Sequence, residues 1–262
     1  MNKKIKKILK KKSKSKVICL TAYSKNVASI LDEHCDLILV GDSLGSVLYN
    51  YKSTKEVTLD IMINHAKSVR LGVKKSLMVV DMPYNTYRNP KEALKNAQLV
   101  MKKTKCDAIK LEGGKKIIHI VKSLVKNKVP VMGHLGILPQ TEKKFTFKGK
   151  KLLERNRILE DAKLLEKAGI FSVVLECIET KLAKEITHKL DIITVGIGSS
   201  ANCDGQVLVI DDLIGLSQSK LRFVKKYANT NQIINSAVKK YKSEVLKSQF
   251  PKAKHSFKNW VN

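Results

Sequence analysis

Six short apolar segments, each followed closely by a polar residue or glycine, most strongly constrain what this chain of 262 residues can fold into. They are LILVGDSLG (37–45), LMVVDMP (77–83), AIKLEGG (108–114), VPVMGHLG (129–136), SVVLEC (172–177) and IITVGIG (192–198). Short apolar runs bounded by turn residues are typical of strands that are buried on both faces. Segments with helical spacing lie between them, and this alternation indicates a parallel sheet.

With one further segment at each end, the pattern predicts eight strands. They are 17–23, 37–42, 77–82, 108–112, 129–134, 172–176, 192–197 and 206–211. Predicted helices separate most of them, at 27–35, 61–72, 90–104, 115–127, 152–168 and 180–189. Eight parallel strands in about 250 residues predict a (β/α)8 barrel. The connection 198–205 is too short for a full helix, so the pattern is incomplete there.

The length fits a single large α/β domain. We expect one barrel domain over residues 1–262, with an N-terminal helix in 1–16 and a C-terminal helical extension over 222–262. We expect the N-terminal helix to pack on the barrel. The segment 136–151 is the longest connection without periodicity, which is typical of a functional loop.

The formal charge of +28 raises the question of nucleic-acid binding. Only five of the 51 basic residues are arginines, and the lysines are spread over every segment. Because arginine is the better reader of bases and phosphates, a lysine excess of this kind favours compositional drift over specific nucleic-acid binding. Steering of anionic substrates stays open as a further role of the charge.

Cysteine content and hydropathy indicate the cellular compartment in which the protein is expected. The five cysteines show no CxxC spacing, which disfavours a disulfide framework or a zinc site. No apolar stretch approaches the ~18 residues of a membrane helix, and the basic N-terminus lacks the apolar part of a secretory signal. We therefore expect a cytoplasmic protein with no membrane partner.

Chemistry is expected where the predicted strands end, since reacting groups in such barrels lie at the carboxyl ends of the strands. The residues found there are Asp42, Ser43, Asp81, Lys110, Glu112, His134 and Glu176. Each has a purely structural alternative. The two aspartates could cap the following helices, Glu112 could pair with Lys110, His134 could be a core histidine, and Glu176 could be a surface residue.

Carboxylates gathered at one small mouth repel each other, and a hard divalent cation relieves the repulsion. Oxygen ligands completed by water are typical of Mg²⁺. Open metal positions would suit the carboxylate and ketone oxygens of a 2-oxo acid, and the metal would then stabilise an enolate. Lys110 would add positive charge, and Glu176 would be free to remove a proton next to the ketone.

At these residues the sequence resembles the ketopantoate hydroxymethyltransferase family. The matching motifs run collinearly over nearly the whole chain. They include TAY (21–23), LVGDSLG (39–45), STxxVTLD (53–60), VVDMP (79–83), IKLEGG (109–114), VPVMGHLG (129–136), LECI (175–178), DGQVLV (204–209), RFVKKY (222–227) and FPxxxHSF (250–257). Such an ordered series is far more specific than any single short motif.

The resemblance implies transfer of a hydroxymethyl group from 5,10-methylenetetrahydrofolate to 3-methyl-2-oxobutanoate, giving 2-dehydropantoate for pantothenate synthesis. It implies Mg²⁺ on Asp42 and Asp81, with Glu112 in or near the coordination shell. Ser43, Asp81 and Lys110 match contacts to the 2-oxo acid, His134 matches a site position, and Glu176 matches the proton-abstracting base. It also implies a phosphoenolpyruvate/pyruvate-type barrel and a homo-oligomer, a decamer.

Two other functions stay open at this point. One is a lyase or mutase on a similar barrel that cleaves a C–C or C–P bond of a 2-oxo or 2-hydroxy acid. Such lyases commonly use a cysteine in a strand-end loop, and over residues 98–127 the only cysteine is Cys106, which precedes a strand. The other is a basic nucleic-acid-binding protein, whose affinity would fall steeply with salt.

Overall fold

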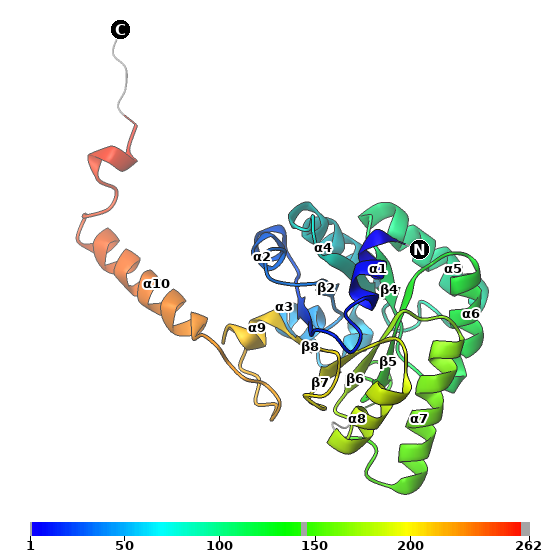
Figure 1. Cartoon of the computed structure of the whole chain (residues 1–262). Helices are drawn as coiled ribbons and strands as arrows, with labels where there is room; N and C mark the ends of the chain where they lie inside the picture. The colour runs from blue at the N-terminus through cyan, green and yellow to red at the C-terminus, as the bar shows by residue number, and fades with distance from the viewer. Residues whose placement is uncertain (1, 143–145, 258–262) are drawn as a thin grey trace. The chain divides into compact units, whose positions relative to one another are not determined.

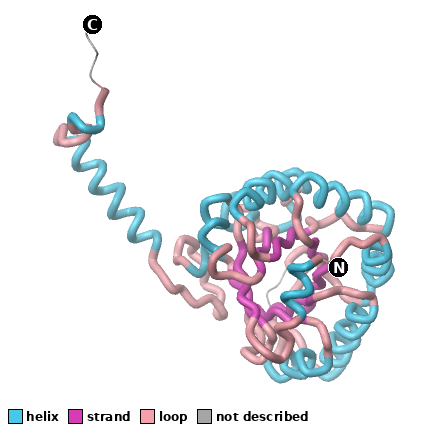
Figure 2. Tube along the Cα trace, turned by 45° about the horizontal axis from the view of Figure 1, so that its top comes forward, coloured by secondary structure: helices cyan, strands magenta, loops and turns pink. Residues whose placement is uncertain are grey.

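The computed structural model describes residues 2–142 and 146–257, and it contains a closed barrel of eight parallel strands. The strands are β1 Val17–Thr21, β2 Leu37–Val40, β3 Leu77–Asp81, β4 Ala108–Lys110, β5 Val131–Gly136, β6 Ser172–Glu176, β7 Ile193–Ile197 and β8 Gly205–Leu208. Each strand pairs with the next along the chain, and β1 pairs with β8 to close the ring (Figures 1 and 2). The predicted fold class is confirmed.

Helices surround the ring of strands, as Figure 2 shows. They are α2 Lys25–Leu31, α3 Leu44–Tyr49, α4 Leu59–Gly72, α5 Pro90–Thr104, α6 Ile118–Lys126, α7 Leu152–Lys167 and α8 Thr180–Lys189. The short 3-10 helices η1 Thr54–Glu56 and η2 Lys115–Ile117 precede α4 and α6. The chain has no helix between β7 and β8, where all residues are described, and this confirms the incomplete repeat seen in the sequence.

Local sequence explains where the helices begin and end. Asn89 accepts a hydrogen bond from the backbone N–H of Glu92 at 2.9 Å and Pro90 follows it, so α5 begins at the predicted residue. Helix α7 ends before Gly169, which has a φ of +97°. Gly72, the last residue of α4, is required by close packing: a Cβ there would lie 2.5 Å from the backbone oxygen of Lys25 on α2.

The chain divides into two compact units, Met1–Ile210 and Asp211–Asn262. The first holds the barrel. The second contains most of α9 Ile210–Leu213, together with α10 Thr230–Leu246 and η3 Ala253–His255. The single-domain assignment with a boundary at residue 222 stays a prediction, and residues 258–262 of that extension lie outside the described residues.

The last predicted strand, 206–211, extends three residues too far at its carboxyl end. β8 ends at Leu208, and Ile210 begins the short helix α9 with Asp211 and Asp212 in its first turn. Acidic residues stabilise the first turn of a helix, and this favours helix over strand there.

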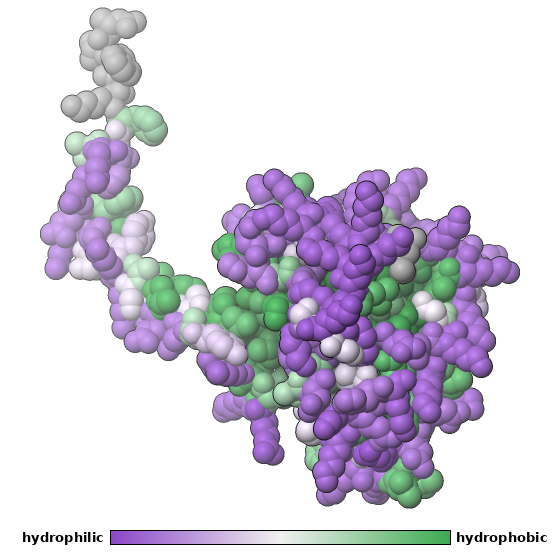
Figure 3. Space-filling view, in the orientation of Figure 1, coloured by the Kyte–Doolittle hydropathy of each residue, from purple (hydrophilic) through white to green (hydrophobic). Residues whose placement is uncertain are grey.

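Helix α1 Lys3–Leu9 closes the amino-terminal end of the barrel (Figures 1 and 2). Its Ile5 and Ile8 are buried in the same apolar cluster as the first residues of several strands, among them Val17, Leu37 and Leu77. The helix therefore packs on the barrel, as expected. The face of the barrel seen in Figure 3 is mostly hydrophilic, and no helix of the described residues is long and apolar enough to cross a bilayer.

Candidate active site at the carboxyl ends of the strands

The barrel brings most of the predicted site residues together at the end opposite α1. Asp81, Lys110 and Glu176 are the last residues of β3, β4 and β6, and His134 lies within β5. Asp42 and Glu112 each lie two residues beyond a strand end. Most of these side chains are buried: Asp42, Asp81, Lys110, Glu112 and His134 are at most 5% exposed.

Asp42 and Asp81 are held against each other. The backbone N–H of Asp42 donates to Oδ2 of Asp81 at 3.1 Å. Burial, followed by the negative charges of Asp81 and Glu112, raises the pKa of Asp42 to about 8. Burial also raises the pKa of Asp81, against the opposing charge of Lys110. Two carboxylates in this position are therefore costly to ionise together.

Lys110 is the buried cation of the site. Its Nζ lies 3.2 Å from Oδ2 of Asp81 and 3.3 Å from Nδ1 of His134. Burial alone would lower the pKa of this lysine, but the charges of Asp81, Glu112 and Asp42 outweigh burial and raise it above the ordinary value. Lys110 is therefore a permanent positive charge at neutral pH.

His134 links two glutamates. Its Nδ1 lies 3.5 Å from Oε1 of Glu112, and its Nε2 lies 3.3 Å from Oε2 of Glu176. Burial and Lys110 act to lower the pKa of His134, but the two glutamates raise it to about 9. Burial would raise the pKa of Glu112, whereas His134 and Lys110 pull it below the ordinary value. The row of contacts thus runs from Asp42 through Asp81, Lys110 and His134 to both glutamates.

Ser43 lies beside this row but contacts a different partner. Its Oγ is 2.8 Å from the hydroxyl of Tyr23. The backbone oxygen of Tyr23 lies 2.8 Å from Nδ1 of His65, whose Nε2 lies 2.9 Å from the hydroxyl of Tyr49. A Cβ at Gly41 would lie 2.8 Å from Oγ of Ser43, so glycine lets the serine hydroxyl fold back toward the barrel.

Gln140 is a buried residue of the site that the sequence analysis missed. Its Nε2 donates to Oδ2 of Asp42 at 2.7 Å and to the backbone oxygen of Met82 at 3.0 Å, and its backbone N–H donates to Oε2 of Glu112 at 3.1 Å. Its Oε1 accepts from the hydroxyl of Tyr87. The long connection after β5 therefore reaches into the site, as its length indicated.

The donor set fits a hard divalent cation held by two carboxylates. Oδ1 of Asp81 is buried and has no hydrogen-bond partner among the described residues. No three His, Cys, Asp or Glu side chains of the described part of the chain converge as a metal-binding group. Two carboxylates with open positions for water and substrate oxygens are typical of Mg²⁺. Both oxygens of Glu112 already face protein groups, so its place among metal ligands stays a prediction.

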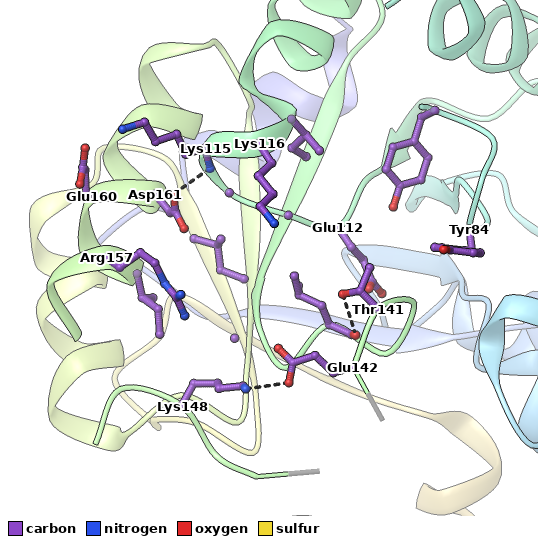
Figure 4. Close-up of a pocket in the computed structure, with 18 of the residues that line it drawn as sticks. Tyr84, Glu112, Lys115, Lys116, Thr141, Glu142, Lys148, Arg157, Glu160 and Asp161 are labelled. Carbon is purple, nitrogen blue, oxygen red and sulfur yellow. Dashed lines mark hydrogen bonds and ion pairs between the residues drawn. The ribbon is translucent and has the colours of Figure 1, made fainter. Parts of the chain in front are cut away.

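A cavity of about 770 Å³ opens beside the site. It shares Glu112 with the site and extends from the loop after β3 to helix α7, as Figure 4 shows. One side carries Tyr84, and the far side carries Lys115 and Arg157 (Figure 4). The site therefore communicates with a space that can hold a second, larger molecule.

Comparison with known protein families gives one match that covers almost the whole chain. The profile of the family described as ketopantoate hydroxymethyltransferase matches residues 2–253. A protein of Pelagibacter ubique named 3-methyl-2-oxobutanoate hydroxymethyltransferase is 66% identical over 257 residues, covering 98% of this chain and 100% of the relative. A protein of Anaplasma marginale with the same name is 48% identical, covering 94% and 90%.

Solved structures support the fold class. The crystal structure of 2,3-dimethylmalate lyase, a member of the PEP mutase/isocitrate lyase superfamily, aligns with a TM-score of 0.62. The alignment covers 96% of this chain and 87% of the lyase, at 10% identity. At that identity the likeness shows the fold alone, and it agrees with the expected eight-stranded parallel barrel.

Proposed function

Because the chain belongs to the ketopantoate hydroxymethyltransferase family of transferases, which serves pantothenate biosynthesis, we propose the complete reaction that it catalyses. It transfers a hydroxymethyl group from 5,10-methylenetetrahydrofolate to 3-methyl-2-oxobutanoate and yields 2-dehydropantoate. The observation that carries this proposal is the buried row of contacts from Asp42 to Glu176 at one end of the barrel.

Asp42 and Asp81 are the residues that would hold Mg²⁺. When bound, Mg²⁺ supplies Lewis-acid polarisation of the 2-oxo group and balances the negative charge that develops there. The unpartnered Oδ1 of Asp81 and the raised pKa of both aspartates support this assignment. Ser43, beside Asp42, would donate its hydroxyl to the substrate carboxylate.

Lys110 would bind and orient the oxo acid by its permanent charge. Its ammonium group lies within 3.3 Å of both Asp81 and His134, so its position is determined from two sides. A buried cation at this place stabilises negative charge more strongly than one in water would. His134 would keep Glu176 and Glu112 apart and oriented, since each carboxylate lies against one of its ring nitrogens.

Glu176 is the group that would remove the C3 proton of 3-methyl-2-oxobutanoate. Its side chain is 12% exposed, whereas Asp42, Asp81 and Glu112 are at most 5% exposed. The electron pair of the C3–H bond then forms the new C–C bond to the methylene carbon of the folate. Atom balance requires one water and the loss of both C–N bonds of that carbon. The water oxygen becomes the new hydroxyl group, and the two folate nitrogens take up the C3 proton and one proton of the water.

Exchange of the C3 proton tests the first half of the reaction without folate. With Mg²⁺ in deuterated water, the wild-type protein should incorporate deuterium at C3 of 3-methyl-2-oxobutanoate. With methylenetetrahydrofolate added, mass spectrometry should detect the one-carbon adduct. Absence of both signals from the folded wild-type protein would overturn the proposal.

A conservative variant tests the assigned base. Glu176→Gln keeps the size and polarity of the side chain but cannot accept the proton. We expect it to bind Mg²⁺ and the oxo acid as the wild type does and to lose exchange. Unchanged exchange would remove Glu176 from this role.

We further propose that the chain acts in the cytoplasm as a homo-oligomer, a decamer, without a nucleic-acid or membrane partner. The family membership supports this proposal. Sedimentation velocity of the full chain tests the assembly, and a mass well below that of ten chains of 29.4 kDa would contradict it.

A further inference from the structure

The cavity beside the active site has two chemically different sides. Tyr84 and Tyr87 are half-buried on the side of the loop after β3, and Leu135 and Leu138 add apolar surface near Glu112. The opposite side is charged, with Lys115, Lys116 and Arg157 in the lining beside the acids Glu160 and Asp161 (Figure 4). A molecule that fills this cavity therefore meets apolar and aromatic surface next to the reacting groups and charged side chains, lysines among them, farther out.

Two of the three cations on the outer side are outside the ion pairs of the described residues, whereas Arg157 lies 3.9 Å from Glu154. Neither ammonium group of Lys115 and Lys116 makes an ion pair with a described residue. Glu142 is already paired with Lys148 at 2.7 Å. Asp161 is half-buried, and its Oδ1 accepts the backbone N–H of Lys115 at 2.7 Å. The two lysine side chains thus remain available for an anionic ligand.

Close packing of the loop after β4 holds these lysines at the cavity. Gly113 has a φ of +132°, and a Cβ at Gly114 would lie 2.2 Å from the carboxylate of Asp161 on α7. Only glycine allows the loop to approach α7 so closely. The chain then turns into η2, and Figure 4 shows Lys116 pointing into the cavity from this turn.

We propose that this cavity binds the benzoyl-glutamate end of the folate co-substrate, with Lys115, Lys116 and Arg157 contacting its carboxylates. The inference rests on the proposed function, since it names the place of the second substrate. The reactive methylene carbon must reach C3 of the oxo acid at the barrel mouth, so the rest of the donor must extend outward past Glu112. A volume of about 770 Å³ lies in the usual range for ligand pockets.

The chemistry predicts a preference for folates with more glutamates. Each added glutamate brings one carboxylate, and the outer side of the cavity offers Lys115 and Lys116, which are in no ion pair of the described residues, together with Arg157. Exposed ion pairs are individually weak, so the gain should accumulate over several contacts rather than come from one. A folate with three glutamates should therefore bind more tightly than one with a single glutamate, and the difference should shrink as salt rises.

Calorimetry on the full chain with Mg²⁺ tests the inference. The probes are the mono- and triglutamate forms of 5-methyltetrahydrofolate, which carry no transferable methylene group. The Lys115→Ala/Lys116→Ala variant should weaken triglutamate binding roughly tenfold and monoglutamate binding by about threefold or less. The control is the Lys122→Ala/Lys126→Ala variant on α6. It removes the same charge as the cavity variant, but from two exposed lysines outside the cavity lining.

The outcomes separate the inference from the proposed function. The site is supported if the cavity variant alone weakens triglutamate binding while folate-independent C3 exchange stays at the wild-type rate. Equal effects of the cavity and control variants, or equal binding of both folates by the wild type, overturn it. Wild-type protein that shows no exchange and no adduct contradicts the proposed function, and binding of the triglutamate still decides the site.

Discussion

The two ends of the barrel use the same charged residue types in opposite ways. At the amino-terminal end, acids that directly precede strands pair with lysines of the N-terminal segment. The pairs are Lys4–Asp107, Lys11–Asp36 and Lys12–Asp204, with side chains that are 6–27% exposed. At the carboxyl end, Asp81 and Lys110 are only 3% and 4% exposed, and the acids outnumber the cations.

Two buried aspartates make the difference clear. Near the amino-terminal end, Asp32 accepts hydrogen bonds from the backbone N–H groups of Lys74, Lys75 and Ser76. Burial would raise its pKa, but these bonds lower it. At the opposite end, burial and neighbouring acids raise the pKa of Asp42. One end of the barrel is therefore arranged for stability, and the other holds carboxylates that are costly to ionise together, at the place where we propose that the reaction occurs.

The largest expected effect comes from neutralising Asp42, one of the buried carboxylates at the carboxyl end of the barrel. Asp42→Asn keeps the shape of the side chain and can still accept from Gln140. We expect C3 exchange to fall roughly 10³-fold, because Asp42 is one of the two carboxylates that would hold the Mg²⁺ that balances the developing negative charge. The melting temperature should stay equal or rise, because repulsion with Asp81 is relieved. A large drop in melting temperature would contradict the comparison.

The next largest effect is expected at helix α1, whose apolar side chains pack on the amino-terminal end of the barrel. Ile5 on α1 is 1% exposed, so Ile5→Ala should reduce the free energy of unfolding by about 3 kcal/mol. Ile5→Val, which removes one methyl group, is the matched control and should cost about 1 kcal/mol. Urea denaturation measures both. The exchange rate at the other end should change little in the folded protein, and a loss of exchange without a loss of stability would break the separation between the two ends.

Asp32→Asn should show a pH-dependent loss of stability. At pH 7 we expect the free energy of unfolding to fall by about 2 kcal/mol, since the charged acceptor of several backbone N–H groups is replaced by a neutral one. The lowered folded-state pKa means that the carboxylate stabilises the fold above its unfolded pKa of about 3.9 and loses this effect as pH falls through the folded value. The difference from wild type in urea denaturation should therefore be constant above about pH 5 and shrink below it. A difference that grows on acidification would contradict the assignment.

The smallest effect is expected from Asp36→Asn, the counterpart of the Asp42 variant at the opposite end. Asp36 pairs with Lys11 at 2.6 Å and accepts the backbone N–H of Ile18. We expect a loss of about 1 kcal/mol in the free energy of unfolding, which high salt reduces, and no change in C3 exchange. An activity loss comparable to that of Asp42→Asn would show that the two ends are not independent.

The sequence predicts the barrel and the meeting of its polar strand ends because both follow from local patterns. Apolar runs mark strands, and parallel order forces Asp42, Asp81, Lys110 and His134 to one end. Gln140 escaped prediction because it is uncharged and lies in a connection without periodicity. Its distance of 98 residues from Asp42 leaves no local signal.

The contacts of the basic N-terminal segment were only partly predictable from the sequence. Its spacing gave a helix with Ile5 and Ile8 on one face, but the partners of its lysines are acids far along the chain. A usable signal exists in retrospect. Asp36, Asp107 and Asp204 each stand immediately before a strand, where carboxylates gather at the end opposite the active site.

Because no helix lies between β7 and β8, we expect the barrel to open locally between these two strands first. β8 is held to β7 at two paired positions, as few as join β4 and β5, and Ile18, the second residue of the adjoining β1, is 48% exposed. Transient opening favours segments with few buried contacts and short pairing. In hydrogen–deuterium exchange, the backbone amides of β8 should take up deuterium before those of β2 or β3. The strands on the far side of the barrel should exchange last.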